Sequence, residues 1–213
     1  MALIHKATLR PTKLELLADW LPGRDWYTGT AGEVSRVNTF RFDDPDGAVG
    51  IETMLVRVGD GPVHQVPLTY REAPLDGGDE WLLGTADHSV LGERWIYDGV
   101  GDPVYVAALA SAILGNTGQA EQFIEVDGRL DPRELSMSIA SSAGSKTAVP
   151  DVGAIQHVTG GDPTVIVTDA VELAVVRRLD VGSELDGVVL TGSWSGPSTP
   201  WPLASATVRH HPQ

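Results

Sequence analysis

The residues best suited to binding chemistry lie on a short apolar stretch near the C-terminal end. Val171–Leu179 is rich in the β-branched residues that strands prefer. Successive strand side chains point to opposite faces, so Glu172 and Ala174 share one face, whereas Arg177 and its neighbour Arg178 point apart. Arg177 is a candidate for binding an anion or a partner's carboxylate. The alternative is an arginine whose stem covers apolar surface while its head stays in water.

Two aromatic residues, Trp26 and Tyr27, stand beside charged residues in a turn-rich segment. They either offer a platform to a ligand or pack a preceding helix against a sheet, because aromatic side chains are also common core material. With Glu172, Ala174 and Arg177 they make up the candidate ligand or partner face.

The other polar residues follow no catalytic or metal-binding pattern. Without cysteine there is no disulfide, thiolate nucleophile, cysteine zinc site or iron–sulfur cluster. Asp87, His88 and Ser89 are triad residue types, but adjacent residues cannot orient one another as a triad requires. The histidines lack the spacings of zinc motifs, which leaves open only a site assembled from distant residues. They are His5, His64, His88, His157, His210 and His211.

Composition and charge restrict the class of protein and its partners. The 213 residues suffice for one large domain or two small ones, and 42% hydrophobic residues can fill a core. The net charge of −14 repels phosphate backbones and anionic lipid, so we expect neither nucleic acid nor a membrane as partner. No apolar run is long enough to span a bilayer, and no signal peptide is evident, which indicates a cytoplasmic protein.

The sequence of residues 1–128 predicts a first module of two helices and an antiparallel meander. Thr12 and Glu15 form a capping box for a helix that ends at Leu21, and Asp102 caps a second helix, Pro103–Leu114. The expected strands are Val34–Asp43, Val49–Val58, Val63–Tyr70, Glu80–Ala86, Arg94–Asp98 and Phe123–Val126. The Val49–Val58 strand is apolar on both faces, which predicts a central strand covered on each side.

Residues 129–213 predict a second, mostly antiparallel module with little helix. The serine-rich run from Gly128 to Pro150 indicates a linker or loose helix, and Trp194–Pro202 indicates a loop. The expected strands are Ile155–Val158, Thr164–Thr168, Val171–Leu179, Gly187–Gly192 and Leu203–Arg209. The fold class is therefore α+β.

Short sequence words in both modules resemble one kinase family. Trp26–Gly29, Gln65–Arg71, His88–Gly92 and Trp95–Asp98 are similar to the N-terminal cap of maltokinases and related glucosamine kinases of actinobacteria. Glu172–Asp180 resembles the small-lobe strand that follows the cap, which reads roughly leucine-lysine-leucine-phenylalanine-arginine-arginine-leucine. The resemblance implies a cap domain at 1–128 and a small-lobe-like domain at 129–213.

Three departures from the family pattern bear on function. Ala174 stands where the resemblance implies the lysine that reaches the nucleotide phosphates, and Glu172 on the same face would repel them. His157–Gly161 does not match the nucleotide-holding turn, and its glycine pair fits a plain hairpin. The chain stops at Gln213, before the family's catalytic large lobe. Phosphoryl transfer needs positioned charge and metal, so we expect no catalysis, no cofactor and no bound metal.

The resemblance and these departures together predict a free-standing, non-catalytic cap-like protein. We expect a protein partner, and the resemblance implies an enzyme of α-glucan, trehalose or maltose-phosphate metabolism. The alternative is a small-molecule binder that accepts a sugar or nucleotide beside Glu172, Ala174 and Arg177 without reacting it. The sequence does not give the oligomeric state.

Overall fold

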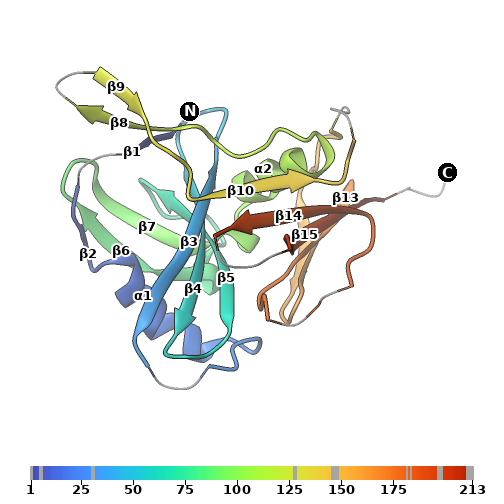
Figure 1. Ribbon diagram of the computed structural model, residues 1–213, viewed down its shortest axis with the longest axis horizontal. Coiled ribbons are helices and arrows are strands. Elements are labelled where there is room, and N and C mark those ends of the chain that lie inside the picture. The colour runs from blue at the N-terminus through green and yellow to red at the C-terminus, as the bar shows by residue number, and fades with distance from the viewer. Residues whose placement is uncertain are drawn as a thin grey trace.

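Two six-stranded sheets, a smaller three-stranded sheet and two α-helices make up the molecule (Figure 1). The computed structural model describes residues 2–4, 7–29, 32–126, 129–144, 149–180, 182, 184–195 and 199–209, with side chains for all of these except 2–4, 125 and 126. His5, His210, His211 and the predicted boundary at Gly128 lie outside this part of the chain. The α+β class expected from the sequence is confirmed.

The first large sheet is an antiparallel meander extended by a second hairpin. Its strand order is β2-β6-β7-β5-β4-β3, and every neighbouring pair is antiparallel. The predicted meander is confirmed to within one residue at most strand ends. The strands are β2 (Leu9–Arg10), β3 (Val34–Phe42), β4 (Gly50–Val58), β5 (Val63–Arg71), β6 (Leu82–His88) and β7 (Gly92–Asp98).

The first helix covers one face of this sheet. α1 (Lys13–Trp20) begins with the predicted capping box, because the Thr12 backbone N–H donates to Glu15 Oε2 at 2.7 Å while the Glu15 N–H donates to Thr12 Oγ1 at 3.3 Å. A 3-10 turn, Leu21–Gly23, follows it. Leu17 packs into an apolar cluster with Met54 and Val56, which face α1 from β4.

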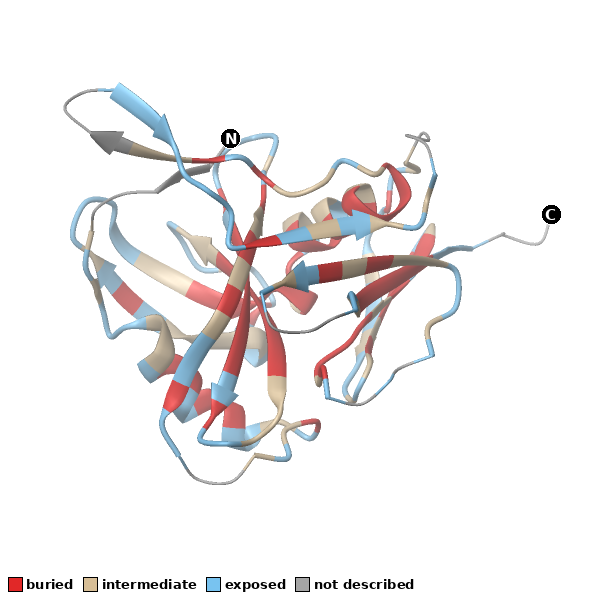
Figure 2. Cartoon of the chain, viewed as in Figure 1, coloured by how far each residue is buried: buried red, intermediate tan, exposed pale blue. Residues whose placement is uncertain are grey.

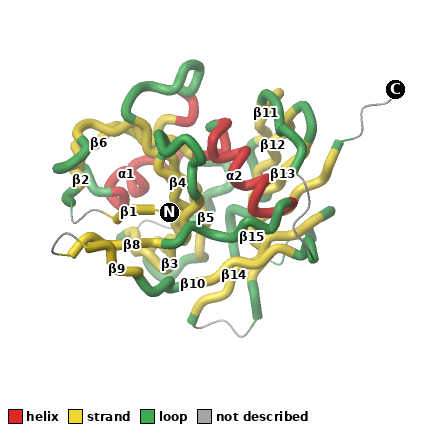
Figure 3. The backbone as a smooth tube through the Cα atoms, turned by 90° about the horizontal axis from the view of Figure 1, so that it is seen from above, coloured by secondary structure: helices red, strands yellow, loops and turns green. Residues whose placement is uncertain are grey.

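The second helix lies between the two large sheets, as Figures 1 and 3 show from different sides. α2 (Pro103–Leu114) begins where the Asp102 carboxylate accepts the Val104 N–H at 2.9 Å. Seven of its residues are buried. Figure 2 shows buried residues, in red, both on the helix and on strands beside it. They are Tyr105, Val106, Leu109, Ala110, Ala112, Ile113 and Leu114.

The second large sheet is wholly antiparallel and has the order β10-β14-β15-β13-β12-β11. Gly160 and Gly161 lie in the turn between β11 and β12, as the hairpin interpretation requires. The strands are β10 (Met137–Ser141), β11 (Ile155–Thr159), β12 (Thr164–Thr168), β13 (Val171–Val175), β14 (Val188–Trp194) and β15 (Trp201–Val208).

Two expectations for this part of the chain were wrong. The serine-rich run predicted as a linker or loose helix contributes the edge strand β10, whose inward side chain Met137 is buried while Ser138 is exposed. Small residues hid this alternation. The strand predicted to reach Leu179 ends at Val175, because the chain turns there to meet the other large sheet.

The segment after β13 joins the two large sheets. The Gln65 N–H donates to the Arg177 carbonyl at 2.8 Å, and the Leu179 N–H donates to the Val63 carbonyl at 2.9 Å. His64 and Arg178 form an antiparallel bridge between these bonds. The segment therefore adds to the part of β5 that β7 leaves unpaired.

One apolar cluster is shared by both large sheets and α2. Ile51 and Leu55 of β4 belong to it, and so do Leu173 and Val175 of β13. β4 is buried on both faces, as its sequence predicted. The division into domains at 128/129 remains a prediction, although the core draws on residues from both sides of it.

A small third sheet lies to one side of the large sheets. β1 (Ala2–Ile4) pairs in parallel with β8 (Gln122–Val126), and β8 pairs with β9 (Arg129–Pro132) in an antiparallel hairpin. Among the residues that the structure describes, no helix is long and apolar enough to cross a bilayer.

Candidate functional site

Glu172 and Ala174 lie on the outer face of the second sheet, as the alternation of β13 predicted. Glu172 is exposed and Ala174 is half-buried, while Leu173 between them is fully buried. The residues beside them on β12 and β15 are uncharged. Ala174 is opposite Val165 and Ser205, and Glu172 is opposite Val167 and Thr207. This face therefore has one carboxylate and no cation among its immediate cross-strand neighbours.

Arg177 is not on that face but deep between the two large sheets, with 1% of its surface exposed. Its guanidinium donates two hydrogen bonds to Asp98, at 2.8 and 3.3 Å, and Nε donates to Thr164 Oγ1 at 2.8 Å. Its head also lies 4.8 Å from the centre of the Trp26 ring. Such a buried charge persists only when it is paired and hydrogen-bonded, and both conditions are met here.

Trp26 and Tyr27 pack beside Arg177 at the junction of the sheets. Trp26 is 7% exposed, and Tyr27 lies 5.1 Å, ring to ring, from the fully buried His64. Burial raises the pKa of the Tyr27 hydroxyl. The aromatic pair thus connects the helical segment after α1 to the sheet, which is the packing role weighed against a ligand platform.

The five candidate residues fall into two groups. Trp26, Tyr27 and Arg177 converge in the junction, whereas Glu172 and Ala174 lie on the opposite side of β13. The two groups do not form one continuous face. The sequence could not separate them because the Asp98 partner of Arg177 is 79 residues away in the chain.

A second charged cluster centres on Glu52, which the sequence analysis did not single out. This β4 residue is 3% exposed and pairs with Lys13 at the start of α1 and with Arg41 of β3 at 3.2 Å. It also accepts hydrogen bonds from Tyr70 at 2.9 Å and Thr39 at 3.0 Å. A glutamate within a strand that is apolar on both faces was the signal, because a carboxylate there must be paired.

The partners of Glu52 set its charge state. Burial alone would raise the pKa of Glu52, but Lys13 and Arg41 outweigh it and lower this pKa to about 2. Burial lowers the pKa of Lys13 against the opposing pull of Glu52, and burial followed by the Glu52 charge raises the pKa of Tyr70 well above its usual value. Glu52 is therefore ionised throughout the neutral range.

A groove of about 520 Å³, here called the Lys13 groove, opens above this cluster. It is mixed in charge and partly apolar, with lysine, arginine, tyrosine and carboxylate groups at its walls. The residues that line it are Ala7, Leu9, Lys13, Arg41, Phe42, Asp43, Asp44, Gly47, Ala48, Val49, Gly50, Ile51, Tyr70, Glu72, His88, Leu91 and Arg94.

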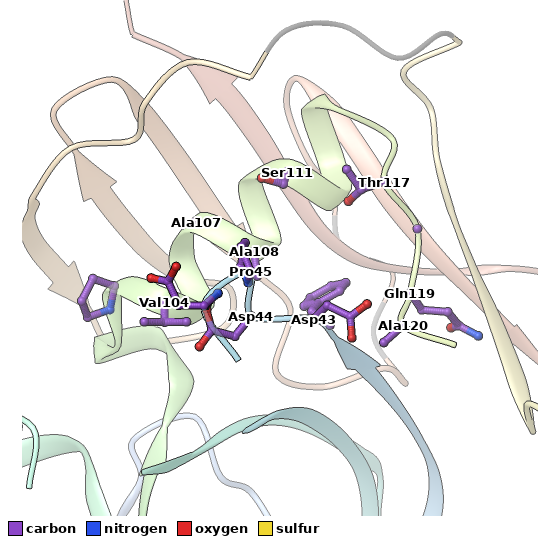
Figure 4. Close-up of a pocket in the computed structure, with 14 residues that line it drawn as sticks. Asp43, Asp44, Pro45, Val104, Ala107, Ala108, Ser111, Thr117, Gln119 and Ala120 are labelled. Atoms are coloured by element: carbon purple, nitrogen blue, oxygen red, sulfur yellow. The ribbon is translucent and has the colours of Figure 1, made fainter. Parts of the chain in front are cut away.

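A second groove, of about 590 Å³, runs along α2 on the other side of the β3–β4 turn. Figure 4 shows Val104, Ala107 and Ala108 on its helical wall and Asp43 and Asp44 facing it from the turn. The Asp44 carboxylate is occupied with its own turn, where it accepts the backbone N–H groups of residues 46, 48 and 49 at 2.8–3.1 Å. None of the five candidate residues lines either groove.

Residues 20–102 match the family model of the maltokinase N-terminal cap domain. This segment is similar to the maltokinase N-terminal cap domain and is called the cap below. No curated protein sequence matches the chain.

The matched segment begins at the last residue of α1 and ends at the residue that caps α2. The cap therefore contains the meander and, among the candidate residues, Trp26 and Tyr27. It also contains Asp98, the partner of Arg177. Arg177 itself lies outside the match, so the buried ion pair ties the cap to the sheet that follows it.

The histidines of the cap have structural surroundings. His64 is buried in the junction, and His88 accepts the backbone N–H groups of Val90 and Leu91 at 3.2 and 3.0 Å through Nδ1. Within the described residues, no three His, Asp or Glu side chains gather as metal ligands would. Asp87, His88 and Ser89 lie at the end of one hairpin, where the Ser89 hydroxyl accepts the Thr8 N–H at 3.0 Å.

Proposed function

We propose that this chain is a non-catalytic binding protein built on a maltokinase cap. Its partner is a protein, and the resemblance to maltokinases favours an enzyme of α-glucan, trehalose or maltose-phosphate metabolism. Fold likeness alone does not fix function. The proposal therefore depends on the sheet face around Ala174, where the resemblance implies that maltokinases bind their nucleotide.

The surroundings of Ala174 carry this proposal. The resemblance places a phosphate-binding lysine at this position, and an alanine methyl makes no charge-assisted contact. The nearest cross-strand side chains are those of Val165 and Ser205, and the neighbouring charge on the same face is the carboxylate of Glu172. A triphosphate would meet a weakly apolar, locally negative sheet face there, which opposes its binding.

The same features suit a protein partner. Val165, Ala174 and Val189 are each half-buried on this outer face, so they offer apolar area without a deep cleft. Protein interfaces combine such apolar centres with polar rims, and Thr207 and Glu172 would lie at the rim. The net charge of −14 favours a partner with a basic surface.

The test is affinity capture from the native cell with three versions of the purified chain. Wild-type protein should reproducibly enrich an enzyme that acts on α-glucans, trehalose or maltose phosphate. Ala174→Glu should lose that enzyme, because a second carboxylate is placed at the centre of the face. Val90→Glu is the matched control, since Val90 is 59% exposed on the β6–β7 turn and belongs to another surface.

Two outcomes would contradict the proposal: no such enzyme is enriched by wild-type protein, or Ala174→Glu and Val90→Glu capture it equally. Isolated wild-type protein should also fail to consume ATP with any sugar acceptor.

The Lys13 groove supports a second candidate function, the binding of a small polar molecule. Its volume suits a sugar, and its arginine, lysine, tyrosine and carboxylate groups could make the directed hydrogen bonds that such ligands need. In the same study, a thermal-shift screen of sugars and nucleotides separates the two functions, because a ligand that binds only folded protein raises the melting temperature. A flat response excludes this candidate.

A further inference from the structure

The β8–β9 hairpin projects from the body of the molecule and exposes its outer strand. Figures 1 and 3 show the hairpin extending away from both large sheets. β9 is the edge of the three-stranded sheet, whose order is β1-β8-β9. All four residues of β9 are exposed, and 47% of the surface of Leu130 is open to solvent. An exposed edge with an exposed leucine invites pairing with another strand.

The backbone groups on the outer edge of β9 allow a partner strand to pair through one residue, Leu130. The Arg133 N–H donates to the Gln122 carbonyl at 2.8 Å, which continues the β8–β9 ladder. Because bonding direction alternates along an antiparallel strand, Arg129 and Asp131 turn their backbone groups toward β8, and Leu130 and Pro132 turn theirs outward. Proline has no N–H, so Leu130 supplies the outward N–H of β9.

The side chains of β9 are complementary to a second copy of themselves. Two antiparallel copies related by a two-fold axis at Leu130 would exchange both Leu130 N–H···O=C bonds. The same register places Arg129 opposite Asp131 of the other copy, twice. Neither residue has an ion-pair partner among the described residues of its own chain. Opposite charges directly across a strand pair stabilise it.

The other face of the hairpin combines apolar residues with one glutamate, because Glu125 of β8 pairs with Leu130. Leu130 and Pro132 share it with Phe123 of β8, since Phe123 pairs with Pro132. Two-fold pairing would place the two Leu130 side chains next to each other and continue this face into the second copy. Proline and charged residues also protect edge strands from pairing, but protection alone does not require an exposed leucine between charges of opposite sign.

We propose that the chain self-associates through β9, which joins two three-stranded sheets into one of order β1-β8-β9-β9-β8-β1. The interface is isologous, because the same four residues contribute from each copy. This inference goes beyond the proposed function and does not depend on it. A single short strand pair buries little area, so the association is weak and concentration-dependent.

Cross-linking tests this interface directly, because the natural chain has no cysteine. Leu130→Cys places two thiols on residues whose Cα atoms lie about 5.5 Å apart in the proposed pair. A short bis-maleimide should link Leu130→Cys into dimers about tenfold or more faster than it links Val90→Cys, since pairing raises the effective thiol concentration. Val90 is the control because it is similarly apolar and 59% exposed. Equal rates would overturn the proposal.

Charge reversal tests the register. In the Leu130→Cys background, Arg129→Asp and Asp131→Arg should each suppress homodimer cross-linking, because like charges then face each other. Mixing the two variants should restore it, with heterodimers exceeding the sum of both homodimers by about threefold or more. Mass spectrometry separates the species. A statistical mixture would overturn the proposal, even if cross-linking is otherwise efficient. Circular dichroism verifies that each variant is folded.

Discussion

Arg177 joins the cap to the second sheet through every part of the residue. Its guanidinium binds Asp98 and Thr164, its planar head lies over Trp26, its N–H donates to the Asp162 carboxylate at 2.7 Å, and its carbonyl accepts the Gln65 N–H. Arginine suits this position because its fork of donors can satisfy several acceptors at once. A residue whose type suggested anion binding is thus occupied by partners within the chain.

His64, next to this junction, should make the fold sensitive to mild acid. It is fully buried, and the backbone of Pro62 is a hydrogen-bond acceptor next to its ring that favours the protonated form only weakly. Burial and the nearby Arg178 charge lower its pKa below the usual 6.5, against Asp180 and Asp162, which raise it. As the pH falls through about 6.5, His64 therefore binds a proton in the unfolded chain but stays neutral in the folded chain.

We expect the free energy of unfolding to be fully retained above pH 6.5 and to fall as the pH drops below it, by at most about 1.4 kcal/mol per pH unit. His64→Leu should remove this slope between pH 6.5 and pH 5. His157→Gln is the control, because His157 is exposed on β11. Urea unfolding at several pH values measures the slope. The same slope in wild type and His64→Leu would show that another group causes it.

At the scale of elements, β4 is the strand around which the cap is assembled. One face packs against α2 and the second sheet, and the other packs against α1. Glu52 interrupts the second apolar face and binds Lys13, which fixes the first turn of α1 over the sheet. A buried carboxylate costs free energy to desolvate, so its value lies in the cations and hydroxyls that meet it.

Replacing Glu52 by glutamine should destabilise the protein in a pH-dependent way. The pKa of Glu52 is about 2 in the fold, below its usual 4.5, so its contribution is present above pH 4.5 and is lost as the pH falls toward 2. At pH 7 we expect a loss of about 2–3 kcal/mol, less than for a fully buried pair because Lys13 reaches water. Glu134→Gln is a control for a simple loss of negative charge, because Glu134 is exposed and lies outside this cluster.

Urea unfolding of wild type and Glu52→Gln at pH 7 and pH 2.5 measures this difference. It should shrink markedly at the lower pH, where wild-type Glu52 begins to take up a proton. An undiminished difference would mean that shape or hydrogen bonding at this position matters more than charge.

Local signals in the sequence predicted most of these elements. Capping residues, turn residues and alternating strands gave α1, α2 and the meander, because each depends on neighbours within a few positions. β10 was missed because a run of serines and alanines shows little contrast between its faces. The end of β13 was misplaced because the competing strand, β5, lies more than 100 residues earlier. The position of Arg177 follows from partners such as Asp98, 79 residues away, and has no local signature. Glu52 did have a local signal, its place in a strand that is apolar on both faces.

At the scale of the whole molecule, the two large sheets share one apolar core around α2. The cluster contains Ile51 of the cap and Leu173 of the second sheet, and helix residues such as Leu109 lie between them. The buried Gln65 side chain adds bonds of 2.9 Å from the cap to the carbonyls of Val176 and Leu203. If one sheet unfolded alone, it would expose the apolar side chains of the other sheet to water, which costs free energy.

Both sheets should therefore unfold in a single cooperative transition. Arg177→Met should lower the stability of the entire molecule by about 3–5 kcal/mol, because it leaves Asp98 buried without its cation. Arg178→Met is the matched control: Arg178 pairs with Asp180 at 3.2 Å near the surface, so its loss should cost about 0–1 kcal/mol.

Hydrogen exchange read separately for β4 and β15 measures both sheets in each variant. Because the core is shared, Arg177→Met should accelerate exchange equally in the two strands. If β15 opens in Arg177→Met while β4 keeps wild-type protection, the sheets are separate cooperative units and the division near residue 128 is a true domain boundary.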